Sequence, residues 1–110
     1  MDKKQTSSFV VSEMRTAEIL KALSHPARIS IMKLLADKQT CICGDITDQL
    51  PLAQSTVSQH LKALKKAGLI KGEIDGVKTC YCIEPDGISE LESLVLSLID
   101  QLKAKPSNCC

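Results

Sequence analysis

The chain has 110 residues, of which 44% are hydrophobic and 25% are charged, and its formal net charge is +1. This length allows one domain with a modest core, and the composition excludes a disordered or fibrous chain. Phe9 and Tyr81 are the only aromatic residues, so a base-stacking platform for single-stranded nucleic acid is disfavoured. We expect a single domain over residues 1–110, with flexible ends at about 1–10 and 105–110.

The N-terminal segment MDKKQTSS leads into no apolar run of signal-peptide length, and no stretch of about 18 apolar residues occurs in the sequence. We therefore expect a cytoplasmic protein with no membrane partner. In that reducing compartment, six cysteines favour metal binding or redox chemistry over structural disulfides.

The first part of the chain predicts two helices. Apolar residues recur every three positions from 12 to 23, which is typical of an amphipathic helix. Pro26 suits a first helical turn, and a wide apolar face continues from there to residue 36.

Two further helices are predicted after a polar connector. A short one covers about 43–50 and ends at Pro51, and a longer one covers about 55–67 and stops at Gly68. Val57, Leu61 and Leu64 define the buried side of the longer helix.

The pattern then changes to alternation on both sides of Asp75-Gly76, a dipeptide typical of a two-residue hairpin turn. After residues 85–87, a last helix carries an apolar seam as far as Leu102, and Pro106 follows it. The order of elements predicts a mainly α-helical winged helix-turn-helix fold with a β-hairpin wing. Apolar stripes on the first and last helices indicate either a homodimer interface or closure of the monomer's own core.

The outward face of the longer helix is small, polar and basic. Ser55, Gln59, Lys62 and Lys66 lie opposite the buried side, with Thr56 and Ser58 beside them. Such side chains suit base edges and phosphates in the major groove of double-stranded DNA. Lys71 and Lys78 place further positive charge on the hairpin.

Four segments together resemble the ArsR/SmtB family of metal-responsive bacterial repressors: ALSHPARISIMKLL, CICGDI, QSTVSQHLKALKKAGLI and DGVKTCYCI, within about residues 14–84. The resemblance implies a homodimeric winged helix-turn-helix repressor, not an enzyme, that leaves its operator DNA when an inducer binds. The family's DNA-contacting positions fall on Gln54, Ser55, Thr56, Ser58, Gln59 and His60, with Lys62 and the wing lysine Lys78 suited to the DNA backbone. His60 lies at the edge of the buried stripe, where a core position or a phosphate contact is favoured over metal binding.

Cys41 and Cys43 match the start of the family motif ELCVCDL, which in the arsenic, antimony, cadmium and lead sensors supplies two thiolates. The resemblance implies As(III) or Sb(III) as inducer, with Cd(II) or Pb(II) as the nearest alternative. Ile46 stands where the arsenic sensors that best match this motif have a third cysteine, so a third thiolate has to come from elsewhere. The candidates are the tail pair Cys109 and Cys110, which we favour as ligands, and the wing pair Cys80 and Cys82.

At the head of a predicted helix, Cys41 and Cys43 are expected to be well placed for ionisation and to suit soft ions. Residues i and i+2 of a helix point about 200° apart, so joint binding predicts an unwound first turn that disturbs the DNA-binding unit. The alternative is that both cysteines are small buried hydrophobic residues.

The sequence is also compatible with functions other than metalloid sensing. A thiol redox or reactive-sulfur sensor of the same fold would form sulfur bridges instead of holding an ion. The last helix contains no histidine, so the interfacial zinc site of the family's zinc sensors is not expected. An enzyme is disfavoured because no C-x-x-C motif, phosphate loop or catalytic triad context occurs.

Overall fold

The computed structural model describes residues 9–38, 42–43, 50–75 and 78–104, and of residues 38, 42–43, 73–75 and 78–79 it describes only the backbone. The elements in chain order are α2 (Val11–Ala22), α3 (Pro26–Lys38), β1 (Ile42–Cys43), α4 (Gln54–Lys66), β2 (Ile70–Asp75), β3 (Lys78–Ile83) and α5 (Pro85–Lys103). Within these ranges, no helix combines the length and apolarity that a bilayer crossing requires.

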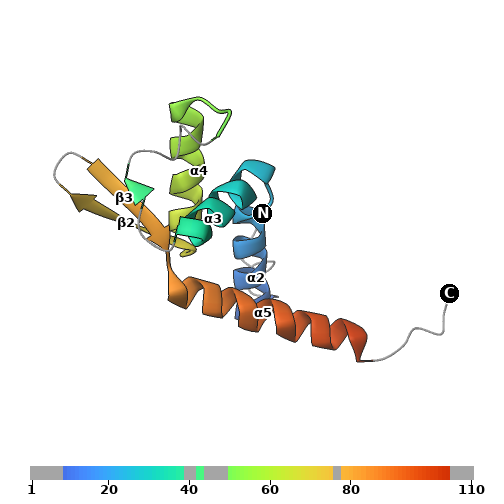
Figure 1. Ribbon diagram of the computed structural model, residues 1–110. Coiled ribbons are helices and arrows are strands. Elements are labelled where there is room, and N and C mark those ends of the chain that lie inside the picture. The colour runs from blue at the N-terminus through green and yellow to red at the C-terminus, as the bar shows by residue number, and fades with distance from the viewer. Residues whose placement is uncertain (1–8, 39–41, 44–49, 76–77, 105–110) are drawn as a thin grey trace.

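The three strands form one antiparallel sheet in the order β1-β3-β2. β2 and β3 make the predicted hairpin, in which Ile70 lies opposite Ile83 and Asp75 opposite Lys78. The predicted turn residue Gly76 lies outside the described residues. The hairpin projects as a wing on one side of the helices, and α5 crosses beneath α2 on its way to the opposite side (Figure 1).

The prediction of a short helix at about 43–50 is wrong at its start. Cys43 belongs to β1, where it lies opposite Cys80 of β3, and Ile42 lies opposite Tyr81. Pairing with a strand almost 40 residues later in the chain overrides the local preference for a helix. A strand of two residues is also too short to show an alternating pattern in the sequence. Residues 44–49 lie outside the described part of the chain.

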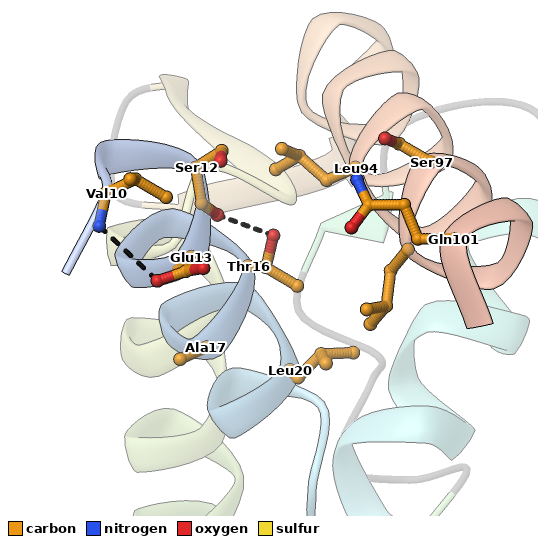
Figure 2. A pocket seen from close by; sticks show the side chains of 10 residues that line it. Val10, Ser12, Glu13, Thr16, Ala17, Leu20, Leu94, Ser97 and Gln101 are labelled. Carbon is orange, nitrogen blue, oxygen red and sulfur yellow. Dashed lines mark hydrogen bonds between the residues drawn. The ribbon is translucent and has the colours of Figure 1, made fainter.

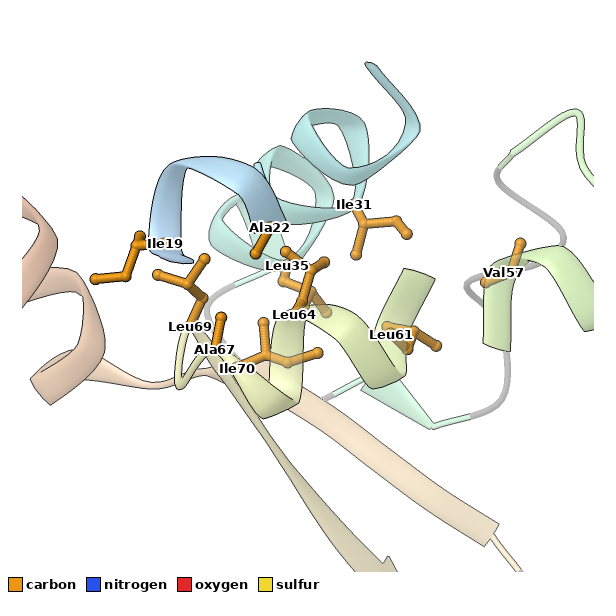
Figure 3. Close-up of a cluster of buried hydrophobic side chains, with 10 residues drawn as sticks. All are labelled: Ile19, Ala22, Ile31, Leu35, Val57, Leu61, Leu64, Ala67, Leu69 and Ile70. Carbon is orange, nitrogen blue, oxygen red and sulfur yellow. The ribbon is translucent and has the colours of Figure 1, made fainter. Parts of the chain in front are cut away.

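A compact aliphatic core joins the helices to the base of the wing (Figure 3). Its members come from α2, α3, α4, the connection after α4 and the start of β2: Ile19, Ala22, Ile31, Leu35, Val57, Leu61, Leu64, Ala67, Leu69 and Ile70. The prediction for Val57, Leu61 and Leu64 is confirmed, since all three are buried.

The apolar stripe predicted on α2 is not the buried side of that helix. Ile19 and Ala22 face the core, whereas Met14 and Leu20 are each 44% exposed. The side of α2 that the three-residue spacing defines is therefore exposed to solvent in the single chain.

Gly68, just after the end of α4, adopts a left-handed backbone conformation. Gly68 has φ of +83°, and the N–H groups of Gly68 and Leu69 donate to the carbonyls of Lys65 and Leu64, which is the Schellman arrangement. The backbone of Gly87, at the start of α5, packs directly against Gly68. The end of α4 and the start of α5 are therefore in direct backbone contact.

Arg15 of α2 connects three helices. Its Nε and Nη2 atoms donate to both carboxylate oxygens of Glu90 on α5, at 2.9 and 2.8 Å, and Nη2 also donates to the carbonyl of Ala67 at 2.7 Å. Nη1 pairs with Glu18. The bond from Arg15 lowers the pKa of Glu90, and the bond to Glu90 raises the pKa of Arg15, so the pair stays charged.

Candidate DNA interface and inducer site

The exposed face of α4 carries the side chains that the sequence singled out for DNA. Val57, Leu61 and Leu64 fill the core side. The opposite side is exposed at Gln54, Ser55, Ser58, Gln59 and Lys62, and Thr56 is half-buried beside them. The helix period separates these two sides because residues three and four apart share a face. The exposed side of α4 therefore carries hydroxyl and amide groups that a binding partner can reach.

Positive charge surrounds this polar face. Lys65 and Lys66 lie in the last turn of α4, and the first turn has no acidic residue. Lys71 on β2 is exposed, whereas Lys78 is described only by its backbone in β3. The polar side chains of such a helix are suited to base edges. Lysines in its last turn are suited to the phosphates next to those bases.

His60 departs from the other predicted DNA-contacting residues. It is 8% exposed, its Nδ1 accepts a hydrogen bond from Nε of Arg28 at 3.1 Å, and its ring lies 4.5 Å from that of His25. The structure thus gives it the core position that the sequence left open, facing α3.

The environment of His60 favours the neutral ring. Burial lowers the pKa of His60, and electrostatic interactions with His25 and Arg28 lower it further. The hydrogen bond from Arg28 also requires Nδ1 without a proton. The sequence gives little sign of this contact, because Arg28 and His60 are 32 residues apart.

The described part of the chain covers only some of the predicted thiol ligands. Cys41, Cys109 and Cys110 lie outside it, and Cys43 is described by its backbone in β1. Within the described residues, no group of three or more His, Cys, Asp or Glu side chains could hold an ion. What the structure adds is the register that sets Cys43 opposite Cys80, a residue that is 6% exposed. Two cysteines on different strands therefore lie opposite each other in the register of the sheet.

A groove of about 420 Å³ separates α2 from α5 (Figure 2). Its lining includes Val10, Leu20, Leu94 and Leu98. Figure 2 shows Leu20 of α2 and Leu94 of α5 on the two sides of the groove. Further exposed apolar side chains lie on the same two segments: Phe9, Val11, Met14, Leu96, Ile99 and Leu102. An apolar surface of this extent on a small chain is typical of an interface.

Helices around an aliphatic core, a β-hairpin wing and a polar, lysine-flanked α4 together define a winged helix-turn-helix DNA-binding regulator. The family model described as bacterial regulatory protein, arsR family, matches residues 25–71. An HTH-type transcriptional regulator of Methanocaldococcus jannaschii is 40% identical over 89 residues, which cover 80% of this chain and 94% of the relative. The chain belongs to the ArsR family of transcriptional regulators.

Two other comparisons bear on the site. The arsenical resistance operon repressor of Bacillus subtilis is 35% identical over 91 residues, covering 82% of this chain and 85% of the relative. A solution structure of a homodimeric winged helix-turn-helix DNA-binding domain from Mycobacterium bovis, described as a possible ArsR-family regulator, has a TM-score of 0.64 and 24% identity. It covers 98% of this chain and 95% of that chain. The winged helix-turn-helix prediction is thus confirmed.

Proposed function

We propose that this chain is a repressor that binds double-stranded operator DNA as a homodimer and releases it when As(III) or Sb(III) binds to cysteine thiolates. The observation that carries the DNA-binding part is the division of α4 into a buried aliphatic side and an exposed face of Ser55, Ser58 and Gln59 beside lysines. Similarity to a repressor of an arsenical resistance operon supports the class of inducer. Cd(II) and Pb(II) are the next candidates, because they also bind thiolates.

The inducer site is proposed at Cys41 and Cys43. Cys43 is in a strand, so the helical geometry that would turn two neighbouring thiols apart does not apply at this residue. We propose Cys109 or Cys110 of the tail as the third thiolate. An ion held by the 41–43 segment would act on the connection between α3 and α4, because β1 lies between these helices in the chain.

The homodimer is proposed to form through α2 and α5. Leu98, Ile99 and Leu102 of α5 are 40%, 40% and 72% exposed, and Phe9 and Val11 are exposed beside the start of α2. Covering these side chains with a second copy removes apolar surface from water. Two linked recognition helices can then occupy two half-sites about 34 Å apart.

Serine at either proposed thiolate tests the inducer site. We expect Cys41→Ser and Cys43→Ser each to bind operator at wild-type affinity but to stay bound when arsenite is added, because a serine hydroxyl remains protonated and is a poor ligand for a soft ion. The measurement is fluorescence anisotropy of labelled operator during titration of the reduced protein with arsenite, antimonite, Cd(II), Pb(II) and Zn(II). A chain without residues 109–110 should need more arsenite for release.

Two outcomes would contradict this site. Release of DNA by arsenite from both serine variants would leave the paired cysteines without a sensing role. A normal response of the shortened chain would move the third thiolate from the tail to Cys80 or Cys82.

Two substitutions on α4 separate base reading from phosphate binding. Gln59→Ala should lose discrimination between operator and unrelated DNA, because an exposed amide near the middle of the helix is suited to a base edge. Lys62→Ala should weaken binding to all sequences and reduce the slope of log affinity against log salt by about one. Binding titrations at several salt concentrations measure both effects, and equal loss of discrimination in the two variants would refute the assigned roles.

A further inference from the structure

Two cysteines face each other across the β1–β3 pair. The antiparallel register puts Cys43 directly opposite Cys80. Opposite residues of antiparallel strands have Cα atoms about 4.5–5.5 Å apart and share a face of the sheet. A disulfide joins Cα atoms about 4.4–6.8 Å apart. The backbone therefore places these two residues within the range of Cα separations that a disulfide spans.

Cys80 is disulfide-bonded. Its neighbour Cys82 is two residues further along the same strand, where Cα atoms are about 6.7 Å apart, near the upper limit for a disulfide. On the β2 side of β3, Cys80 lies opposite Glu73 and Cys82 opposite Lys71, so β2 offers no cysteine to either residue. Among the cysteines whose backbone is described, Cys43 is the best-placed partner for Cys80.

We propose that Cys43 and Cys80 form a thiol–disulfide couple that low-molecular-weight disulfides, such as oxidised glutathione, can oxidise. One protein thiolate attacks the small disulfide and displaces one small thiol. The second protein thiolate then attacks the mixed disulfide and displaces the other. One S–S bond forms in the protein while one is reduced in the small molecule, so atoms and electrons balance.

This couple gives the wing a role separate from DNA contact. β1 lies in the chain between α3 and α4, and β3 belongs to the wing, so the bond ties the connection between the helices to the hairpin. Provided that the proposed inducer site is correct, the bond also blocks it, because oxidised Cys43 has no thiolate to offer. Oxidation would then hold the regulator in a form that does not respond to arsenite.

The linkage is tested on the full-length reduced chain, incubated with oxidised glutathione and compared by intact mass and by fragmentation of protease-derived peptides. We expect Cys43 and Cys80 of the wild type together to lose the mass of two hydrogen atoms, to retain no glutathione on either residue, and to yield a peptide linked between them. Cys43→Ser and Cys80→Ser should abolish this linkage and instead retain glutathione. The matched controls Cys41→Ser and Cys82→Ser, each two residues from a member of the couple, should preserve it.

A linkage that maps to Cys41, Cys82 or the tail, or that persists in Cys80→Ser, would overturn the assignment. So would a wild-type chain that accumulates only glutathione adducts. Each of these outcomes is independent of whether arsenite is the inducer.

The effect on sensing is measured separately, by adding arsenite to the oxidised chain on labelled operator. We expect no release until a reductant is added, and release from oxidised Cys80→Ser, which keeps the Cys43 thiol once the adduct is removed by glutaredoxin. Release from the linked wild type would refute the blocking effect. Failure of the reduced wild type to respond would instead refute the proposed inducer, and the mapped disulfide would stand.

Discussion

Aspartate at Leu98 is expected to convert the protein into a monomer and to lower operator affinity by about 100-fold or more. Leu98 lines the groove between α2 and α5 and is 40% exposed in the single chain, so it contributes little to the monomer's own core. A carboxylate there would have to be buried without a partner in the proposed homodimer. Loss of the dimer also removes the gain that comes from joining two half-site contacts.

Analytical ultracentrifugation and operator titration measure this effect together. Ser93→Asp is the matched control, because it adds the same charge to α5 at an exposed position five residues away, on a different side of the helix. We expect the control to remain dimeric and to bind operator normally. Leu98 is preferred over Leu94, which packs against the core, so its replacement would also disturb folding. A monomeric Leu98→Asp variant with wild-type affinity would refute the need for a dimer.

Alanine at Gly87 is expected to destabilise the fold by about 3 kcal/mol. A Cβ at this position would overlap the carbonyl oxygen of Gly68. Neither atom can move by a side-chain rotation, because the Cβ is fixed to the backbone of residue 87 and the oxygen belongs to the backbone of Gly68. Intrinsic helix propensity predicts the opposite sign, since alanine is favoured over glycine in helices by about 1 kcal/mol. The sign of the change therefore distinguishes the close contact of α4 and α5 from a local helix effect.

Urea unfolding of purified protein measures the change through the transition midpoint. Gly72→Ala is the matched control, because a Cβ there would meet side-chain atoms, with Tyr81 Cε1 at 3.2 Å and Lys65 Nζ at 3.4 Å. These groups can move by a few tenths of an ångström, so we expect a change within about 1 kcal/mol. A Gly87→Ala variant as stable as the wild type would show that α5 can move away from Gly68.

Much of the helical framework could be predicted from local pattern. Helix α4 was expected at about 55–67 and covers Gln54–Lys66, and its core side is the one that the 3.6-residue period selects. The hairpin around Asp75-Gly76 was expected for an equally local reason, since turn chemistry and alternation both lie within a dozen residues. The exposed polar face of α4 follows from the same period, whereas its contacts with DNA remain a prediction.

Contacts between distant segments could not be predicted from local pattern. The sequence predicted the four long helices and the hairpin, because capping, turn residues and apolar period act over a few neighbours. It did not predict that Arg15 pairs with Glu90, 75 residues away, or that Arg28 donates a hydrogen bond to the buried ring of His60. Nor did it place Cys43 in a strand opposite Cys80, because such a pairing depends on the sheet edge that the wing provides. The apolar side of α2 that stays exposed was likewise decided by packing, since one periodic pattern is compatible with a core and with an interface.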